Sequence, residues 1–190
     1  MITVALTPHL LLILSSLSGF SLKLADIHSE RQPNMTSYTI AGATAVLFSL
    51  LIADNPSTST LTLGIMIGVT LAAKVNQKSL IFGGMVTMLI AFILGIATPI
   101  AWMLITVAAL TWIDEIGHDK LETDTGLPAL FFRYRLTLKL GVLILTATGH
   151  LGAVHAASFY GFDIAYDITG WRLAQAIGEV NTARNHQEEA

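Results

Sequence analysis

Charged residues are scarce in this chain. They make up 12% of its 190 residues, roughly half the share found in soluble domains. The mean hydropathy is +0.66, and the 53% of residues that are hydrophobic fall in long blocks. So few charges could not keep the surface of a soluble globular domain in water, and stretches of about 20 apolar residues match the hydrocarbon core of a bilayer. The composition therefore predicts an all-α, polytopic integral membrane bundle.

The chain also lacks cysteine, which excludes disulfides, thiolate metal sites and cysteine nucleophiles. It has no phosphate-binding loop, nucleophile elbow, zinc-protease motif or dinucleotide fingerprint. His150 and His155 point about 140° apart around a helix, so they do not form the paired ligands of a haem. We therefore expect no haem, no nucleotide and no nucleic-acid partner. No positive segment precedes the first apolar block, which predicts a retained helix rather than a cleaved signal peptide.

Six apolar stretches are long enough to be interpreted as membrane spans. Thr7 and Pro8 provide an N-cap and a first helical residue for the first of them. The spans are expected at residues 7–24, 36–53, 59–73, 79–97, 98–113 and 136–160. This pattern predicts a six-span transmembrane domain over residues 1–162, followed by an extramembrane C-terminal tail over 163–190.

The basic residues predict how such a six-span chain is oriented. Of the ten, only Arg172 and Arg184 would lie on the side of the two termini. The other eight would share the opposite side: Lys23, Arg31, Lys74, Lys78, Lys120, Arg133, Arg135 and Lys139. Because cytoplasmic loops carry the excess of Lys and Arg, this distribution predicts cytoplasmic polar connections and two extracytoplasmic termini.

Small residues recur every four positions in three of the spans. The three sets are Gly64, Gly68 and Ala72; Ala41, Ala45, Ser49 and Ala53; and Gly149, Ala153, Ala157 and Gly161. Small residues in register let membrane helices approach closely. We expect them to pack the core of the bundle, with a homo-oligomer face as the alternative.

Polar residues gather where the first, third and fifth spans end, on one expected side of the membrane. Four acids there are the candidate catalytic residues: Asp26, Glu30, Asp114 and Glu115. Asp114 and His118 are one helical turn apart, as are Glu115 and Asp119, so these four residues are the candidate metal ligands. Hard carboxylate oxygens favour Mg²⁺ or Mn²⁺. Simple ion pairs in a solvated loop are the alternative.

Basic side chains accompany these acids. Lys23, Lys74, Arg133 and Arg135 are the candidate substrate-binding residues, because lysine and especially arginine bind phosphate oxygens. Together, acids and cations at one membrane face favour a metal-dependent enzyme that acts on a lipid or polyprenyl phosphate. A small membrane transporter, or its substrate-binding membrane component, is the first alternative. A structural or assembly subunit is the second.

A third alternative comes from residues 26–34. With Pro33 and Asn34 following Asp26, this stretch resembles the first-aspartate region of prepilin and preflagellin peptidases. That resemblance implies a membrane aspartyl protease with a second aspartate in a Gly-x-Gly-Asp motif. At the corresponding place this chain has Lys74-Val75-Asn76, so the second carboxylate that an aspartyl mechanism needs is replaced by an amide.

Overall fold

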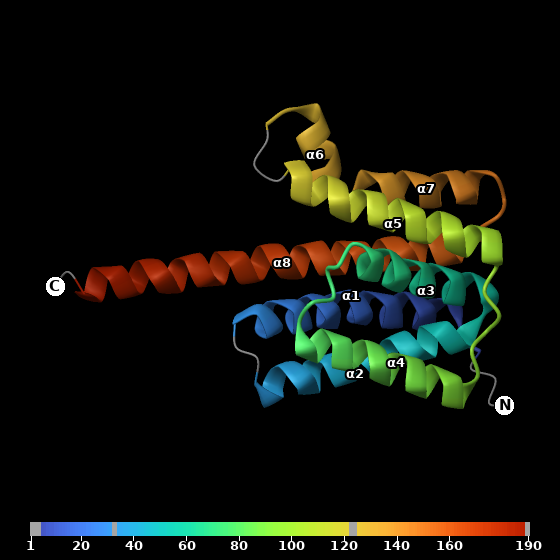
Figure 1. Ribbon diagram of the computed structural model, residues 1–190, viewed down its shortest axis with the longest axis horizontal. Coiled ribbons are helices and arrows are strands. Elements are labelled where there is room, and N and C mark those ends of the chain that lie inside the picture. The colour runs from blue at the N-terminus through green and yellow to red at the C-terminus, as the bar shows by residue number, and fades with distance from the viewer. Residues whose placement is uncertain (1–4, 32–33, 122–124, 189–190) are drawn as a thin grey trace.

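The computed structural model describes residues 5–31, 34–121 and 125–188, with side chains as far as residue 175. Within these residues the protein is all-α, with eight helices and no strands. The helices are α1 (Pro8–Arg31), α2 (Met35–Asp54), α3 (Pro56–Leu71), α4 (Lys78–Leu94), α5 (Ala101–Leu121), α6 (Leu127–Arg133), α7 (Leu136–Ala147) and α8 (Ala153–Glu188). All except the short α6 run along one axis in alternating directions (Figure 1).

Two of the described helices, α1 and α2, are long and apolar enough to cross a membrane. Their 24 and 20 residues have a mean hydropathy of 1.6 over the best window. Three further apolar helices, α3, α4 and α7, are shorter. The all-α expectation is confirmed for the described residues, because they form helices and no strands. The six-span bundle stays a prediction.

Local capping explains where the early helices begin and end. Asn34 accepts hydrogen bonds from the N–H groups of Thr36 and Ser37, and the Ser37 hydroxyl closes the capping box at the start of α2. Asn55 ends α2 and caps α3, accepting from Ser57 and Thr58 at 3.0 and 3.1 Å. These asparagines make the turns tight, so consecutive helices are antiparallel neighbours.

The expected single helix over residues 136–160 is wrong. The chain instead reverses between α7 and α8, where Gly149 has a φ of +76° that a larger residue rarely adopts. The N–H groups of His150 and Leu151 both bond to the Leu145 carbonyl, at 2.9 and 3.0 Å, which closes the end of α7. As a result α8 returns along the bundle, and α1 begins at the opposite end from the one where α8 finishes (Figure 1).

Residues after 162, expected as a tail, thus belong to a long helix that packs lengthwise on α1. The helix crosses residue 163 without a break, and the proposed domain boundary there stays a prediction. Figure 1 shows the last part of α8 projecting beyond the other helices.

Small residues allow the closest helix pairs. A Cβ on Gly68 of α3 would lie 2.7 Å from the Ala108 carbonyl oxygen of α5. In α2, Ser49 donates to the Thr87 carbonyl of α4 at 3.0 Å. The expectation of core packing is therefore confirmed for the small residues of α2 and α3. The third set of small residues is not one stripe, because Gly149 lies in the turn before α8.

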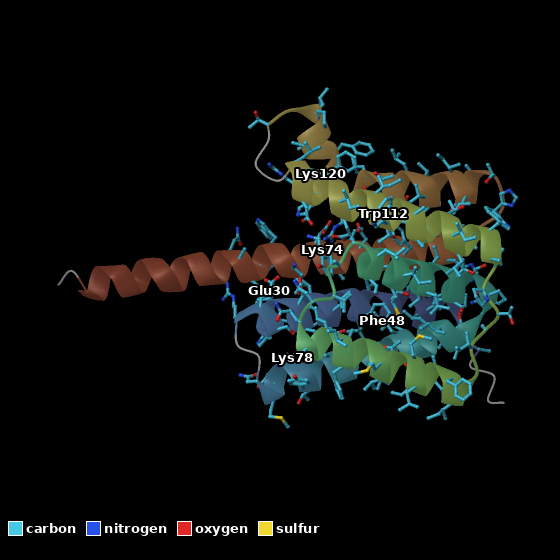
Figure 2. All side chains as sticks on the ribbon, in the orientation of Figure 1. Glu30, Phe48, Lys74, Lys78, Trp112 and Lys120 are labelled. Carbon is cyan, nitrogen blue, oxygen red and sulfur yellow. The ribbon has the colours of Figure 1, made fainter. Side chains whose placement is uncertain are left out.

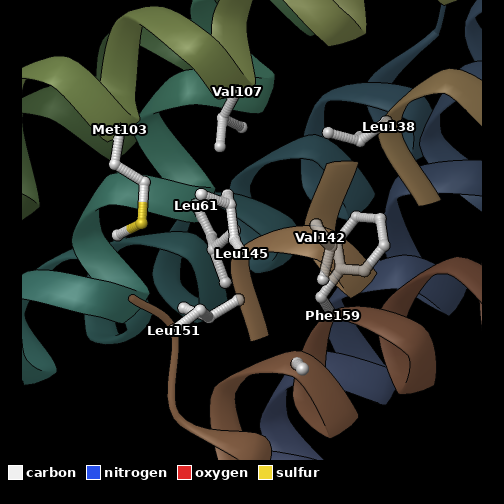
Figure 3. Packing of buried hydrophobic residues seen from close by; sticks show 9 residues of the cluster. Leu61, Met103, Val107, Leu138, Val142, Leu145, Leu151 and Phe159 are labelled. Carbon is white, nitrogen blue, oxygen red and sulfur yellow. The ribbon is translucent and has the colours of Figure 1, made fainter. Parts of the chain in front are cut away.

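The main hydrophobic core lies where α3, α5, α7 and α8 meet (Figure 3). Its most completely buried members are Met103, Val107, Val142 and Leu151. By contrast, large apolar side chains are exposed on the outer face of α4, including Met85, Leu89 and Phe92. Such a face suits hydrocarbon surroundings better than water.

Candidate functional site

The two ends of the bundle differ sharply in charge. We define the charged end as the one where α1 and α5 finish and α7 begins. Because α8 turns back toward this end, all ten basic residues of the sequence belong to segments that lie at it or project beyond it (Figure 1). Figure 2 shows Glu30, Lys74, Lys78 and Lys120 gathered there.

Tyr166 of α8 is the centre of a polar network at this end. Its hydroxyl lies 3.4 Å from both Lys23 Nζ and Asp26 Oδ2 on α1, and these two form an ion pair of 2.9 Å. Lys23 Nζ is also 4.8 Å from the centre of the Tyr166 ring, and the Arg135 guanidinium is 5.3 Å from it. Cation–π contacts of this kind add electrostatic attraction. We call the connected set the charged network: Lys23, Asp26, Glu115, Arg135, Lys139, Asp163, Tyr166 and Asp167.

Three further ion pairs complete the charged network. Arg135 Nη2 lies 3.2 Å from Glu115 Oε1, and the Glu115 side chain is only 6% exposed. Burial lowers the pKa of Arg135, but its contacts with Tyr166 and with the charged Glu115 outweigh burial and raise this pKa above its usual value. Lys139 Nζ lies 2.9 Å from Asp163 and 3.4 Å from Asp167. The network therefore ties α8 to both α1 and α7, and α5 to the α6–α7 connection.

Asp114 has a different role from its neighbour Glu115. Its carboxylate, in a residue only 1% exposed, accepts hydrogen bonds from the backbone N–H groups of Thr137 and Leu138 at 3.0 and 2.7 Å. These are free N–H groups of the first turn of α7, where the N-cap residue Arg135 has a φ of +50° and makes no side-chain cap. Asp114 of α5 thus caps the N-terminus of α7, a different helix. The free N–H groups and the dipole of α7 stabilise a carboxylate at this position.

The four expected catalytic acids are therefore not equivalent. Asp26 and Glu115 belong to one charged network, with Tyr166 and Arg135 between them. Asp114 is engaged with the backbone of α7. Glu30 is exposed near the end of α1.

Of the four expected metal ligands, the three acids each have a different partner. Asp119 forms an ion pair with Lys74, while His118 Nδ1 is buried and has no hydrogen-bond partner among the described residues. Within the described part of the chain, no three His, Asp or Glu side chains are grouped as metal ligands would be. A site for Mg²⁺ or Mn²⁺ stays a prediction.

Of the four expected substrate-binding cations, Lys23 and Arg135 are paired with acids of the charged network. Lys74 is half-buried beside Asp119, and Arg133 is exposed at the end of α6. For the prepilin-peptidase resemblance, Pro33 lies outside the described residues.

Sequence reasoning missed the α8 half of the charged network. Asp163, Tyr166 and Asp167 were assigned to the opposite side because the chain was expected to cross the membrane once between 136 and 160. Their spacing of three and four residues marks one helix face. The turn-forming pair Gly149 and Gly152 was the available signal for a reversal.

No protein family, curated protein or solved structure matches the chain. Inferences about function therefore depend on the residues of the charged end and on what surrounds them.

Proposed function

We propose that this chain is a multi-pass membrane protein whose charged end faces the cytoplasm and binds a phosphate-bearing lipid, such as a polyprenyl phosphate. The observation that carries the proposal is the position of the basic residues. All ten belong to segments at or beyond one end of the bundle, and an excess of Lys and Arg marks the cytoplasmic side of membrane proteins.

The proposed topology has seven passes instead of six. The α7–α8 reversal supplies the additional pass and leaves the N-terminal end of α1 extracytoplasmic and the C-terminal end of α8 cytoplasmic. With 12 residues, α7 is about 18 Å long, shorter than a typical bilayer core. Local thinning of the bilayer accommodates a short span at modest cost.

Basic residues at the rim of the charged end are the proposed phosphate ligands. Within the charged network each cation faces an acid in a pair that is mostly screened from water, so an added anion gains little there. The Lys74–Asp119 pair is more exposed, at 35% and 51%. Lys74, Lys78, Lys120 and Arg133 lie outside the network and form what we call the rim cations. The Lys74–Asp119 ion pair brings the α3–α4 connection against the end of α5, so three of the rim cations share one edge.

A metal-assisted reaction on the bound phosphate is the second candidate, favoured by the buried and unpartnered Nδ1 of His118 near the rim. An imidazole nitrogen beside Asp119 could serve as one ligand of Mn²⁺. Mg²⁺ would then bind more weakly than Mn²⁺, because Mg²⁺ prefers oxygen ligands.

The proposed topology has a direct test, because the chain contains no cysteine. Single-cysteine variants Ser57→Cys and Arg172→Cys are treated in intact cells with a membrane-impermeant maleimide. We expect labelling at position 57 without lysis and at position 172 only after lysis. Labelling of position 172 in intact cells would contradict a cytoplasmic charged end.

The lipid proposal is tested with radiolabelled farnesyl phosphate and protein in nanodiscs of zwitterionic lipid. Joint Lys74→Gln and Lys78→Gln substitution is expected to weaken binding about tenfold, the effect of losing one charge-assisted contact. Arg172→Gln, on the far part of α8, is the matched control and should bind normally. Equal binding by all three proteins would overturn the rim as the phosphate site. A Mn²⁺-dependent release of inorganic phosphate that His118→Ala abolishes would support the metal-assisted candidate, and no release would exclude it.

A further inference from the structure

Helices α3 and α4 follow one another in the chain but do not pack together. Each packs on α2 instead, and α3 also packs on α5. The space between them is a cavity of about 130 Å³. Its floor is formed by α1 and α2, its walls by α3 and α4, and Val75 of the α3–α4 connection lies at one end.

The lining of this cavity is apolar because its polar side chains are already bonded. The hydroxyls of Thr44, Thr70 and Thr87 each donate to the carbonyl one turn earlier in their own helix, at 2.7–2.9 Å. A hydrocarbon chain in the cavity would therefore leave no donor without a partner. Water, in contrast, needs two or more polar partners in such a space.

Small residues create the cavity. Ala41 and Ala45 on α2 are almost fully buried, and they face α4 where it carries Gly83 and Gly84. A Cβ on Gly83 would approach Ala41 at 3.2 Å, whereas a Cβ on Gly84 would meet nothing within 4 Å. Gly84 therefore borders open space, which a side chain at this position would occupy.

The surroundings of the cavity identify its occupant. The outer face of α4 exposes Met85 and Leu89, at 62% and 60%, and such a face suits hydrocarbon surroundings. At the charged end, the lining residues Val75 and Leu80 flank a segment that includes Lys78, and Lys74 directly precedes Val75. An apolar cavity lined at one end by residues of the segment that carries two rim cations matches an amphiphile with an anionic head and an apolar chain.

We propose that this cavity holds the hydrocarbon chain of the lipid whose phosphate the rim cations bind. The inference rests on the proposed function and adds that the protein binds the hydrocarbon chain of the lipid as well as its phosphate. A volume near 130 Å³ resembles that of cavities, about 150 Å³, that take up one benzene-sized group. It accommodates one single chain segment of about five carbons, an isoprene unit included, and is too small for two chains side by side.

The test uses two photoreactive probes in nanodiscs: an alkyl phosphate and the corresponding alkyl alcohol, each with a diazirine in the chain. After irradiation, peptide mapping locates the labelled residues. With the phosphate probe, we expect labelling of the cavity residues Leu22, Ile65, Met66 and Leu80. The variant Gly84→Leu fills the cavity and should reduce this labelling about tenfold, as expected when two methylene groups lose their buried site.

The matched control is Gly42→Leu, because a Cβ on Gly42 also meets nothing within 4 Å and this residue does not line the cavity. It should label like the unsubstituted protein, and both variants gain helix propensity over glycine. Undiminished cavity labelling in a folded Gly84→Leu variant would overturn the chain site. If the alcohol labels the cavity as strongly as the phosphate, the chain site stands and phosphate recognition by the rim fails.

Discussion

The two ends of the bundle keep their helices together by different means. At the charged end, hydrogen bonds to charged side chains join helices that are distant in sequence, such as α1 with α8 through the contacts of Tyr166 with Lys23 and Asp26. At the other end, Asp54 is the only Asp, Glu, Lys or Arg that the described residues place there. Its carboxylate accepts from the Leu6 N–H at 2.8 Å and the Thr58 hydroxyl at 3.2 Å.

Backbone groups at the uncharged end are also bonded within the protein. The N–H of Ala97 donates to the Ile52 carbonyl at 3.1 Å, and the N–H of Ile100 donates to Thr60 Oγ1 at 2.8 Å. These bonds fix the link between α4 and α5 without using charge. The difference teaches that the two ends are stabilised in different ways: charged side chains connect the helices at one end, while small residues and caps pair helices along the whole bundle.

The largest expected effect concerns the packing that returns α8 to the charged end. A Cβ on Gly19 of α1 would collide with the carbonyl oxygen of Phe162 on α8. This oxygen is a backbone atom, so it cannot move away unless the helix itself shifts. Gly19→Val is expected to cost about 3 kcal/mol or more, because backbone overpacking forces the helices apart. The melting temperature in detergent measures this loss. Gly42→Val, which meets nothing within 4 Å, is the control, and equal melting temperatures would contradict the close α1–α8 contact.

The next effect separates the cap at Asp114 from a catalytic carboxylate. Asp114→Ala removes the acceptor of two backbone N–H groups of α7, and we expect a loss of about 2–3 kcal/mol in the free energy of unfolding. Asp114→Asn keeps one acceptor oxygen and should lose about half as much. Denaturant titration in mixed micelles gives both values. If Asp114→Asn and Asp114→Ala are both as stable as the unsubstituted protein, Asp114 is not a structural cap.

Sequence reasoning predicted the helical class, and the gaps it left between the first three spans contain Asn34 and Asn55, which cap α2 and α3 locally. It failed at the reversal after α7, because apolar residues continue on both sides of Gly149 and were given more weight than the turn-forming pair Gly149 and Gly152. That single error separated Asp163, Tyr166 and Asp167 from Lys23 and Arg135, which Tyr166 contacts. Arg135 was one of three cations that sequence reasoning offered as ion-pair partners of Asp114 and Glu115, and it pairs with Glu115. The backbone partners of Asp114 could not be predicted, because they depend on how α5 packs against α7.

The smallest effects compare two ion pairs at the charged end itself. Glu115 is 6% exposed beside Arg135, whereas Lys74 and Asp119 are 35% and 51% exposed. Double-mutant cycles with Glu115→Gln and Arg135→Gln should give a coupling energy of about 1–2 kcal/mol, since one partner is screened from water. The cycle with Lys74→Gln and Asp119→Asn should give about 0.5 kcal/mol or less.

Salt distinguishes the two pairs further. Raising ionic strength to 1 M shortens the screening length to about 3 Å, which should abolish the coupling between Lys74 and Asp119 and leave most of that between Glu115 and Arg135. Equal coupling energies, or equal loss in salt, would mean that both pairs are solvated. In that case Arg135 would be as available to an external phosphate as the rim cations, and the division between a closed network and an open rim would have to be abandoned.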